Sequence, residues 1–221
     1  MTTKNSIGLT NKVGLTNKVG IIVFDKVLTS EVIAPAEVFG IARQKSWFSD
    51  WEVLLIGVEP KATITTAEGI TLSVNATIFD DLSLNTLIVP GAYDTTHLLH
   101  NEALNSFIQK QEEAAQWIGS NCSGAFLLAN AGVLNGTQAT TWLGGEAQLQ
   151  EQFPDVKVVF DAPVVVDRRR VTSNGGLVSY RAAFVLLAQL SSAEHAREVF
   201  DGLHVDRVGD WTAVESVISG Q

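Results

Sequence analysis

The chain is poor in cysteine and in positive charge. Cys122 is the single cysteine among 221 residues, and 15 Lys and Arg stand against 24 Asp and Glu, for a formal net charge of −9. One cysteine excludes an intrachain disulfide and a multi-thiolate metal site. The acidic balance argues against a nucleic-acid partner, because binding a phosphate backbone requires clustered Lys and Arg. The only basic run, at 168–170, is typical of a solvated turn.

Long apolar runs are also absent. No stretch approaches the ~18 apolar residues of a membrane-spanning helix. The first six residues are not followed by the apolar run that a secretory signal peptide contains. We therefore expect no membrane partner and a cytoplasmic location. Hydrophobic residues make up 46% of the chain and charged residues 18%, which is typical of a folded globular protein.

The N-terminus carries a short repeat. Residues 8–13 (GLTNKV) recur unchanged as residues 14–19. One copy is too short to be a structural repeat unit. We expect 1–16 to be a flexible tail and 17–221 to be a single domain, because no linker divides the rest of the chain.

Strand and helix signals alternate along this domain. Short β-branched runs predict buried strands of a parallel sheet, and segments with helical apolar spacing predict the helices between them. Strands are predicted at 19–24, 51–58, 87–91, 117–119, 138–141, 156–160, 164–166 and 171–172, a hairpin at 63–66 and 70–74, and helices at 32–42, 101–115, 125–132, 179–190 and 193–200. Pro35 suits the first turn of its helix better than the interior. This order predicts an α/β fold in three layers, a doubly wound and mostly parallel sheet between helices.

A sharp strand-to-helix turn is predicted around Cys122. The segment 120–124 (SNCSG) has the small-x-nucleophile-x-small pattern of a nucleophile elbow, which places the central side chain at the ligand-binding edge of the sheet. Cys122 is therefore the predicted nucleophile, and the following helix N-terminus favours its thiolate. The backbone of Ser123, with that of Gly91 and Ala92 facing it, is the predicted source of oxyanion donors. The alternative is a small buried hydrophobe, the usual fate of a free cysteine.

Glu31 falls in the loop after the first strand, at the same edge. An ionised carboxylate raises the pKa of a neighbouring thiol, whereas a carboxyl kept protonated by burial donates a hydrogen bond to the thiolate and holds a proton for the reaction. We therefore predict Glu31 as the catalytic partner of Cys122. The alternative is a carboxylate that only interacts with a helix dipole.

Two histidines lie just beyond the Pro90-Gly91 turn. The spacing of His97 and His100 places both on one helical face, but two histidines without a third ligand make a weak metal site. We expect no metal and no cofactor. His97 is kept as a pocket-lining residue and a candidate base.

Three motifs resemble those of the ThiJ/PfpI superfamily, within the class I glutamine amidotransferase-like fold. The segment 31–39 (EVIAPAEVF) resembles its acid-x-x-x-Pro-x-acid-Val segment, 87–92 (LIVPGA) its Pro-Gly turn, and 121–136 (NCSGAFLLANAGVLNG) its elbow helix and exit loop. The resemblance covers about 18–200. It implies a flavodoxin-like fold, a homodimer, and an acid at Glu31 that faces the cysteine.

The chain departs from that family in one place that bears on chemistry. Many members follow the elbow helix with Ala-Thr-Thr-His, and that His approaches the cysteine, but 139–142 reads ATTW here. The resemblance implies that Trp142 lines the pocket, near Thr141 and Asn121. Ser123 stands where peptidase-like members have His, and no His-x-Glu pair follows late in the chain. Neither peptidase nor glutaminase activity is therefore expected.

The resemblance is nearest to two branches, the isocyanide hydratases and the sensor domains of AraC-type regulators. The first implies hydration of an isocyanide to an N-formamide, a branch that does not depend on the missing His but usually has Asp where Glu31 stands. A glyoxalase-like lyase and a non-catalytic redox or metabolite sensor are the alternatives. The segment 175–180 (GGLVSY) is similar to the sensor domains, and with the sequence ending at Gln221 we expect no appended DNA-binding module. The expected partners are a small-molecule substrate and a second copy.

Overall fold

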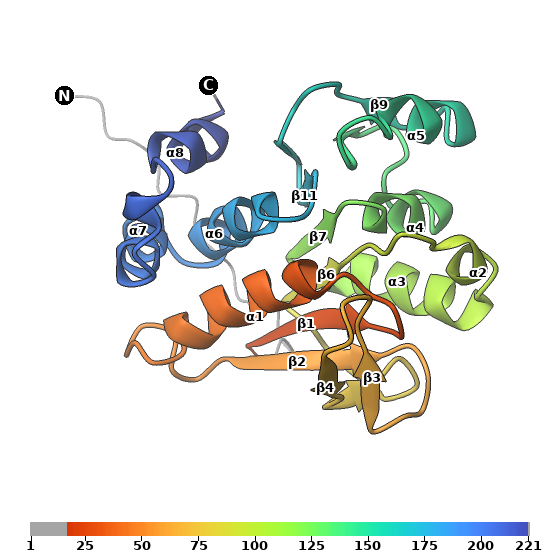
Figure 1. Ribbon diagram of the computed structural model, residues 1–221, viewed down its shortest axis with the longest axis horizontal. Helices are drawn as coiled ribbons and strands as arrows, with labels where there is room; N and C mark the ends of the chain where they lie inside the picture. Colours follow the sequence, from red (N-terminus) through yellow and green to blue (C-terminus); the bar gives the residue numbers. More distant parts are fainter. Residues whose placement is uncertain (1–16, 221) are drawn as a thin grey trace.

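The structure is a computed structural model that describes residues 17–220, so the predicted tail at 1–16 lies outside the described residues. A seven-stranded sheet in the order β10-β11-β7-β6-β1-β2-β5 runs through it (Figure 1). Its strands are β1 (Lys18–Val23), β2 (Glu52–Gly57), β5 (Ala76–Thr77), β6 (Thr86–Val89), β7 (Trp117–Asn121), β10 (Val164–Asp167) and β11 (Arg170–Ser173). Every neighbouring pair is parallel except β10 with β11. The prediction of a mostly parallel α/β sheet is thus confirmed.

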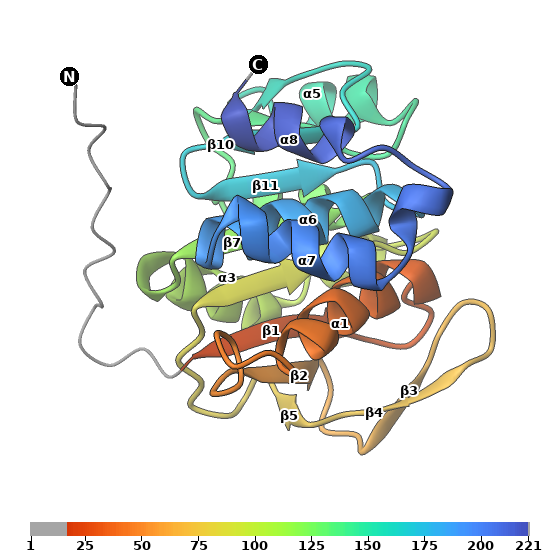
Figure 2. The same cartoon turned by 90° about the vertical axis from the view of Figure 1, so that its left-hand side faces the viewer.

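Helices cover both faces of the sheet, which gives three layers. They are α1 (Thr29–Ala42), α2 (Thr96–Leu99), α3 (Glu102–Ala114), α4 (Gly124–Asn130), α5 (Glu146–Gln152), α6 (Val178–Leu190), α7 (Ala193–Gly202) and α8 (Thr212–Ser219), with a 3₁₀ turn η1 (Val205–Arg207). Helices α1, α6 and α7 lie together on one face, and α3 and α4 on the other (Figures 1 and 2). Two further pairs are small, the hairpin β3 (Thr63–Thr65) with β4 (Thr71–Ser73) and the pair β8 (Gln138–Ala139) with β9 (Lys157–Val158).

The strand order reverses direction beside β1. From β1 the chain adds β2 and β5 on one side, and then returns to place β6, β7 and β11 on the other. Ligands of such sheets bind outside the carboxyl ends of the strands at this reversal. The segments that follow β1, β6 and β7 meet there, and they carry Glu31, Gly91 and Cys122. Glu31 lies in the first turn of α1 and not in the loop before it, as was expected, because the helix begins at Thr29.

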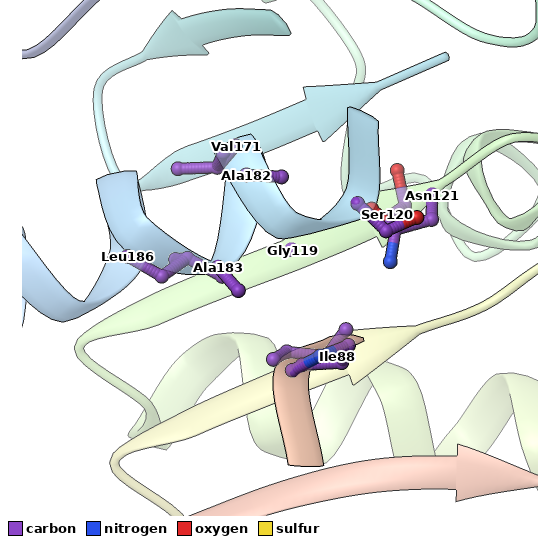
Figure 3. A pocket seen from close by; sticks show the side chains of 10 residues that line it. Ile88, Gly119, Ser120, Asn121, Val171, Ala182, Ala183 and Leu186 are labelled. Carbon is purple, nitrogen blue, oxygen red and sulfur yellow. The ribbon is translucent and has the colours of Figure 1, made fainter. Parts of the chain in front are cut away.

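Helix α6 packs closely on the centre of the sheet. Gly119 of β7 makes this possible, because a Cβ at that position would lie 3.0 Å from the Leu186 side chain. Figure 3 shows Ala182, Ala183 and Leu186 of α6 over Gly119 and Ser120. The small cavity between them has no room for a water molecule, so this layer is a packed core and not a binding site.

Pro35 lies inside α1 as its seventh residue, so the expectation of a first-turn proline was wrong. A proline has no N–H, and the carbonyl of Glu31, four residues earlier, therefore lacks its helical donor. The Asn121 side chain replaces that donor, with Nδ2 donating to the Glu31 carbonyl oxygen at 3.3 Å. The end of β7 is thereby tied to the start of α1.

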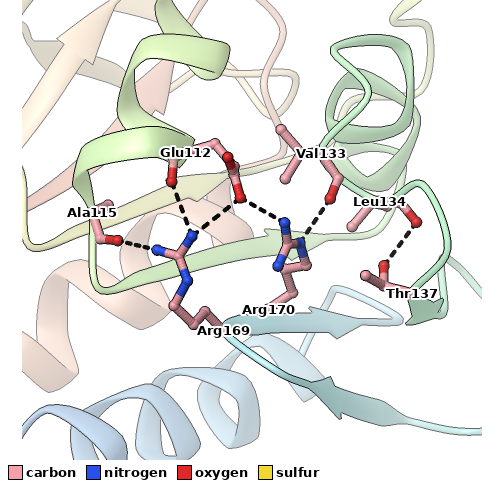
Figure 4. Close-up of polar contacts among 7 residues, drawn as sticks. All are labelled: Glu112, Ala115, Val133, Leu134, Thr137, Arg169 and Arg170. Atoms are coloured by element: carbon pink, nitrogen blue, oxygen red, sulfur yellow. Dashed lines mark hydrogen bonds and ion pairs between the residues drawn. The ribbon is translucent and has the colours of Figure 1, made fainter.

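The arginine run is less solvated than expected. Arg169 and Arg170 share the Glu112 carboxylate of α3, at 3.2 and 2.6 Å, and Arg170 also donates to the Val133 carbonyl (Figure 4). Only Arg168, in the turn between β10 and β11, is exposed. The pair joins the hairpin to α3.

The sequence did not predict β5, α2, α5, η1 or α8. Each has eight residues or fewer, and in so short a segment periodicity is a weak signal. None of the helices within 17–220 has the length and apolar character needed to cross a membrane.

Candidate active site

The turn at Cys122 has the geometry of a nucleophile elbow. Its backbone φ of +50° lies in the left-handed region, which is unfavourable for a residue with a side chain. The Cys122 N–H donates to the Ser173 carbonyl at 2.9 Å, and its own carbonyl accepts from Thr141 Oγ1 at 2.8 Å. A side chain at Gly124 would collide with the Val89 backbone. Neighbouring strands and a small residue at 124 thus hold the strained turn in place.

Glu31 is buried beside this elbow. The Gly91 N–H donates to its Oε2 at 2.6 Å, and none of the described residues completes an ordinary hydrogen bond to Oε1. The Gly176 N–H and the Cys122 thiol nevertheless lie close enough to stabilise its charge. Burial outweighs these donors and raises the pKa of Glu31 to about 7. Both protonation states of Glu31 are therefore populated near neutral pH.

The pKa of Cys122 is raised, to about 12, and not lowered. Burial is the main cause, and the negative charge of Glu31 adds to it. The Ser123 N–H acts in the opposite direction but is too weak to compensate. The expectation of a thiolate favoured by the helix N-terminus was therefore wrong, because burial and Glu31 outweigh a helix of seven residues. The resting state is a thiol next to a carboxyl that can accept its proton.

A glycine pair closes the site from the side of β11, and sequence reasoning did not assign it there. Gly175 has φ +83°, and a Cβ at this position would lie 2.6 Å from the Cβ of Cys122 and closer still to Glu31 Oε1. The Gly176 N–H faces Glu31. The available signal was the sequence itself, since two adjacent glycines follow a predicted strand.

Two of the three predicted oxyanion donors already donate hydrogen bonds within the protein. The Gly91 N–H is bonded to Glu31, and the Ala92 N–H donates to Ser123 Oγ at 2.9 Å. Neither is free to face a ligand, so these residues position Glu31 and Ser123. The Ser123 N–H is the one of the three predicted donors that faces the sulfur.

A pocket of about 620 Å³ opens above Cys122 and Ser123. Trp142 forms part of its wall and stacks on Phe126, with ring centroids 5.1 Å apart. A side chain at Gly145 would collide with the Trp142 ring, so a glycine there allows this placement. Other lining side chains are neutral, aliphatic or acidic, and none is Lys or Arg: Leu28, Ala92, Tyr93, Asp94, Thr95, Thr96, Leu99, Gln148 and Gln152.

Three predicted pocket residues lie elsewhere. Asn121 is buried and bonds to the Glu31 carbonyl and to Ser173 Oγ, behind the cysteine. Thr141 is fully buried and supports the Cys122 carbonyl. His97 is exposed on α2 and does not line the pocket. The first two therefore support the elbow, and His97 is badly placed to act as a base.

None of the remaining histidines lines the Cys122 pocket. His100 follows α2, His195 of α7 stacks on Trp47 with ring centroids 4.0 Å apart, and His204 precedes η1. Within 17–220 no three His, Cys, Asp or Glu side chains form a group that could hold a metal ion.

Comparison with known proteins identifies the family. The profile of the DJ-1/PfpI family matches residues 17–189. The chain belongs to the DJ-1/PfpI family. The matched residues include the sheet, the turn at Cys122 and the glycine pair.

Individual relatives are distant. The HTH-type transcriptional regulator GbdR of Pseudomonas aeruginosa is 28% identical over 133 residues, 60% of this chain and 35% of the regulator. The isonitrile hydratase of Pseudomonas putida is 33% identical over 78 residues, 35% of this chain and 34% of that enzyme. The chain thus spans about a third of each. A ThiJ/PfpI family protein from Pseudomonas syringae has the same fold, with a TM-score of 0.75, 22% identity, and 94% of this chain and 83% of that one covered.

Proposed function

We propose that the protein is a cysteine-dependent hydratase that converts a small isonitrile into the corresponding N-formamide. The observation that carries this proposal is Cys122 in the wall of a 620 Å³ pocket, with the Glu31 carboxyl buried beside the thiol and a carboxyl pKa of about 7. No histidine lines this pocket, and the Glu31 carboxyl lies against the Cys122 thiol, so in this proposal Glu31 moves the protons. The partial match to an isonitrile hydratase supports this chemistry.

The first half of the reaction adds the thiol across the terminal carbon of the isonitrile. Glu31 as a carboxylate accepts the Cys122 proton while the sulfur bonds to that carbon. The carbon then takes the proton from Glu31, which gives a thioimidate, R–N=CH–S–Cys122. A thiol with a high pKa requires such a base, because little thiolate exists in the resting state.

The second half returns the enzyme to its starting state. The oxygen of a water molecule adds to the thioimidate carbon. Glu31 accepts one proton of that water and donates it to the nitrogen. The carbon–sulfur bond then breaks, the oxygen becomes the formyl carbonyl, and the hydroxyl proton returns to sulfur. The sum is R–NC + H₂O → R–NH–CHO. In this proposal the Ser123 N–H, which faces the sulfur, also stabilises charge that develops on the atoms bonded to it.

The test is formamide formation from an alkyl and an aryl isonitrile, followed by NMR. We expect turnover by the wild type, none by Cys122→Ser, and at least a hundredfold loss in Glu31→Gln. Glu113→Gln, an exposed carboxyl on α3, is the matched control and keeps full activity. Unchanged turnover in Cys122→Ser would sink the mechanism. Consumption of a dicarbonyl in place of the isonitriles would support the glyoxalase-like alternative.

A second candidate is a non-catalytic sensor, and the match to GbdR favours it. In that role the Cys122 pocket binds a metabolite without turning it over. A redox sensor is the weaker version, because oxidation proceeds through the thiolate and the pKa of Cys122 is high. Intact mass after mild peroxide distinguishes them, since a gain of two oxygens on Cys122 supports redox sensing.

A homodimer and a cytoplasmic location stay predictions that rest on family resemblance and on composition. Light scattering at micromolar concentration tests the first, and a monomer there would remove it.

A further inference from the structure

A second hollow lies on the outer side of α6, away from Cys122. It has a volume of about 520 Å³ and shares no lining residue with the Cys122 pocket. Helices α6 and α7, η1, and the start of α8 surround it, and these elements lie side by side in Figure 2. Its size is that of a pocket for a small organic molecule.

The wall of this hollow is apolar. Phe184, Phe200 and Val214 form buried parts of it, while Leu177 and Val208 stand at its rim with 83% and 88% of their surface exposed. Exposed aliphatic side chains of this size beside a hollow indicate a surface that binds an apolar group.

Its polar side chains differ in whether they already have partners. The Tyr180 hydroxyl donates to Glu37 Oε2 at 2.6 Å, and burial together with Glu37 raises the pKa of Tyr180 to about 12, so the phenol keeps its proton. Asp210 accepts the Thr212 N–H at the start of α8. The Arg181 guanidinium, in contrast, has no hydrogen bond or ion pair with any residue between 17 and 220. Its five donors are therefore open to a ligand, and Arg181 is the one cationic side chain among the lining residues.

We infer that this hollow is a binding site for a monocarboxylate with a compact apolar body, held by Arg181. A planar guanidinium pairs with a carboxylate through two parallel hydrogen bonds, and the apolar wall takes the hydrocarbon part. Glu37 and Asp210 line the same hollow and repel a second negative charge, which disfavours phosphates and dicarboxylates. This site is independent of the reaction proposed for Cys122.

Isothermal titration calorimetry of the full chain with octanoate tests the inference. We expect one octanoate per chain, and binding at least tenfold weaker in Arg181→Gln. Arg43→Gln, an exposed arginine at the end of α1, is the matched control and binds octanoate as the wild type does. Octylammonium, which has the same number of carbon atoms and the opposite charge, binds at least tenfold more weakly than octanoate.

Two further measurements distinguish this site from the Cys122 pocket and from a dimer interface. Carbamidomethylation of Cys122 places a polar group in the other pocket and leaves octanoate affinity unchanged, whatever the outcome of the isonitrile assay. Loss of binding after this modification, or equal binding by Arg181→Gln, overturns the inference. Light scattering adds a third outcome that overturns it: a wild-type dimer that binds no octanoate and that Val208→Asp makes monomeric shows that a second copy covers this face.

Discussion

The two ends of strands β7 and β11 differ in whether their charged groups have partners of opposite charge. At their amino ends, Arg169 and Arg170 flank one carboxylate, Glu112, and all three charges are paired. At their carboxyl ends, Glu31 is buried next to a thiol and has no cationic partner among the described residues. The first arrangement fixes the hairpin to the helix beside it. The second leaves a proton that is easily exchanged, which is the property that catalysis requires.

The difference predicts which residues stability and chemistry depend on. Changes at the amino ends of the strands are expected to alter the free energy of unfolding and to leave Cys122 reactivity alone. Changes at the carboxyl ends are expected to alter both, because backbone strain, burial and the reactive groups coincide there.

Gly175→Ala gives the largest expected change in stability. Its φ of +83° and the collision of the new Cβ with Cys122 and Glu31 predict a loss of about 4 kcal/mol in the free energy of unfolding. Urea denaturation measures it. Gly202→Ala, at the end of α7 with open space around it, is the control and changes stability little. If Gly175→Ala lowered the free energy of unfolding by less than about 1 kcal/mol, the close packing of this loop against Cys122 and Glu31 would be contradicted.

The pH dependence of stability reports the burial of Glu31. Its pKa rises from 4.5 in the unfolded chain to about 7 in the folded one, so the folded state holds this proton between those values and the unfolded state does not. The stabilising contribution is complete below pH 4.5 and is lost as the pH rises through 7, a change of about 3 kcal/mol. Comparison of the wild type with Glu31→Gln by urea denaturation at pH 5 and pH 8 isolates it. If the free energy of unfolding changed by the same amount between pH 5 and pH 8 in both proteins, the raised pKa of Glu31 would be contradicted.

Glu112→Gln gives the smallest expected effect. It leaves Arg169 and Arg170 without a charged partner, and the Arg170 side chain is only 13% exposed, which predicts a loss of about 1–2 kcal/mol. The rate of Cys122 alkylation stays unchanged, because the site lies at the other end of the strands. A slower or faster alkylation in this variant would break the distinction between the two ends.

Much of the fold and the centre of the site follow from the sequence. The elbow at Cys122 is predictable from its pattern of small residues, of which Gly124 leaves no space for a side chain, and the buried strands are recognisable as apolar runs. Glu31 is predictable as a neighbour of Cys122 because both follow strands whose carboxyl ends meet at the same edge of the parallel sheet, which is where such sheets bind ligands.

Other features depend on contacts between distant segments and could not be predicted. Asn121 points to the carbonyl that Pro35 leaves free, a pairing across 90 residues that no local pattern contains. Whether the pKa of Cys122 is raised or lowered depends on how deeply the thiol is buried, and that burial is set by loops from distant parts of the chain. The role of Gly175 likewise depends on which side chains approach it.

The most direct test of the coupling between Cys122 and Glu31 is the pH dependence of Cys122 alkylation by iodoacetamide, followed by intact mass in the wild type and in Glu31→Gln. The single cysteine makes the mass change unambiguous. We predict an apparent thiol pKa well above the usual ~8.5 in the wild type, and a lower one in Glu31→Gln, where the neighbouring charge is gone. A wild-type pKa below ~8.5, or the same pKa in both proteins, would contradict that coupling.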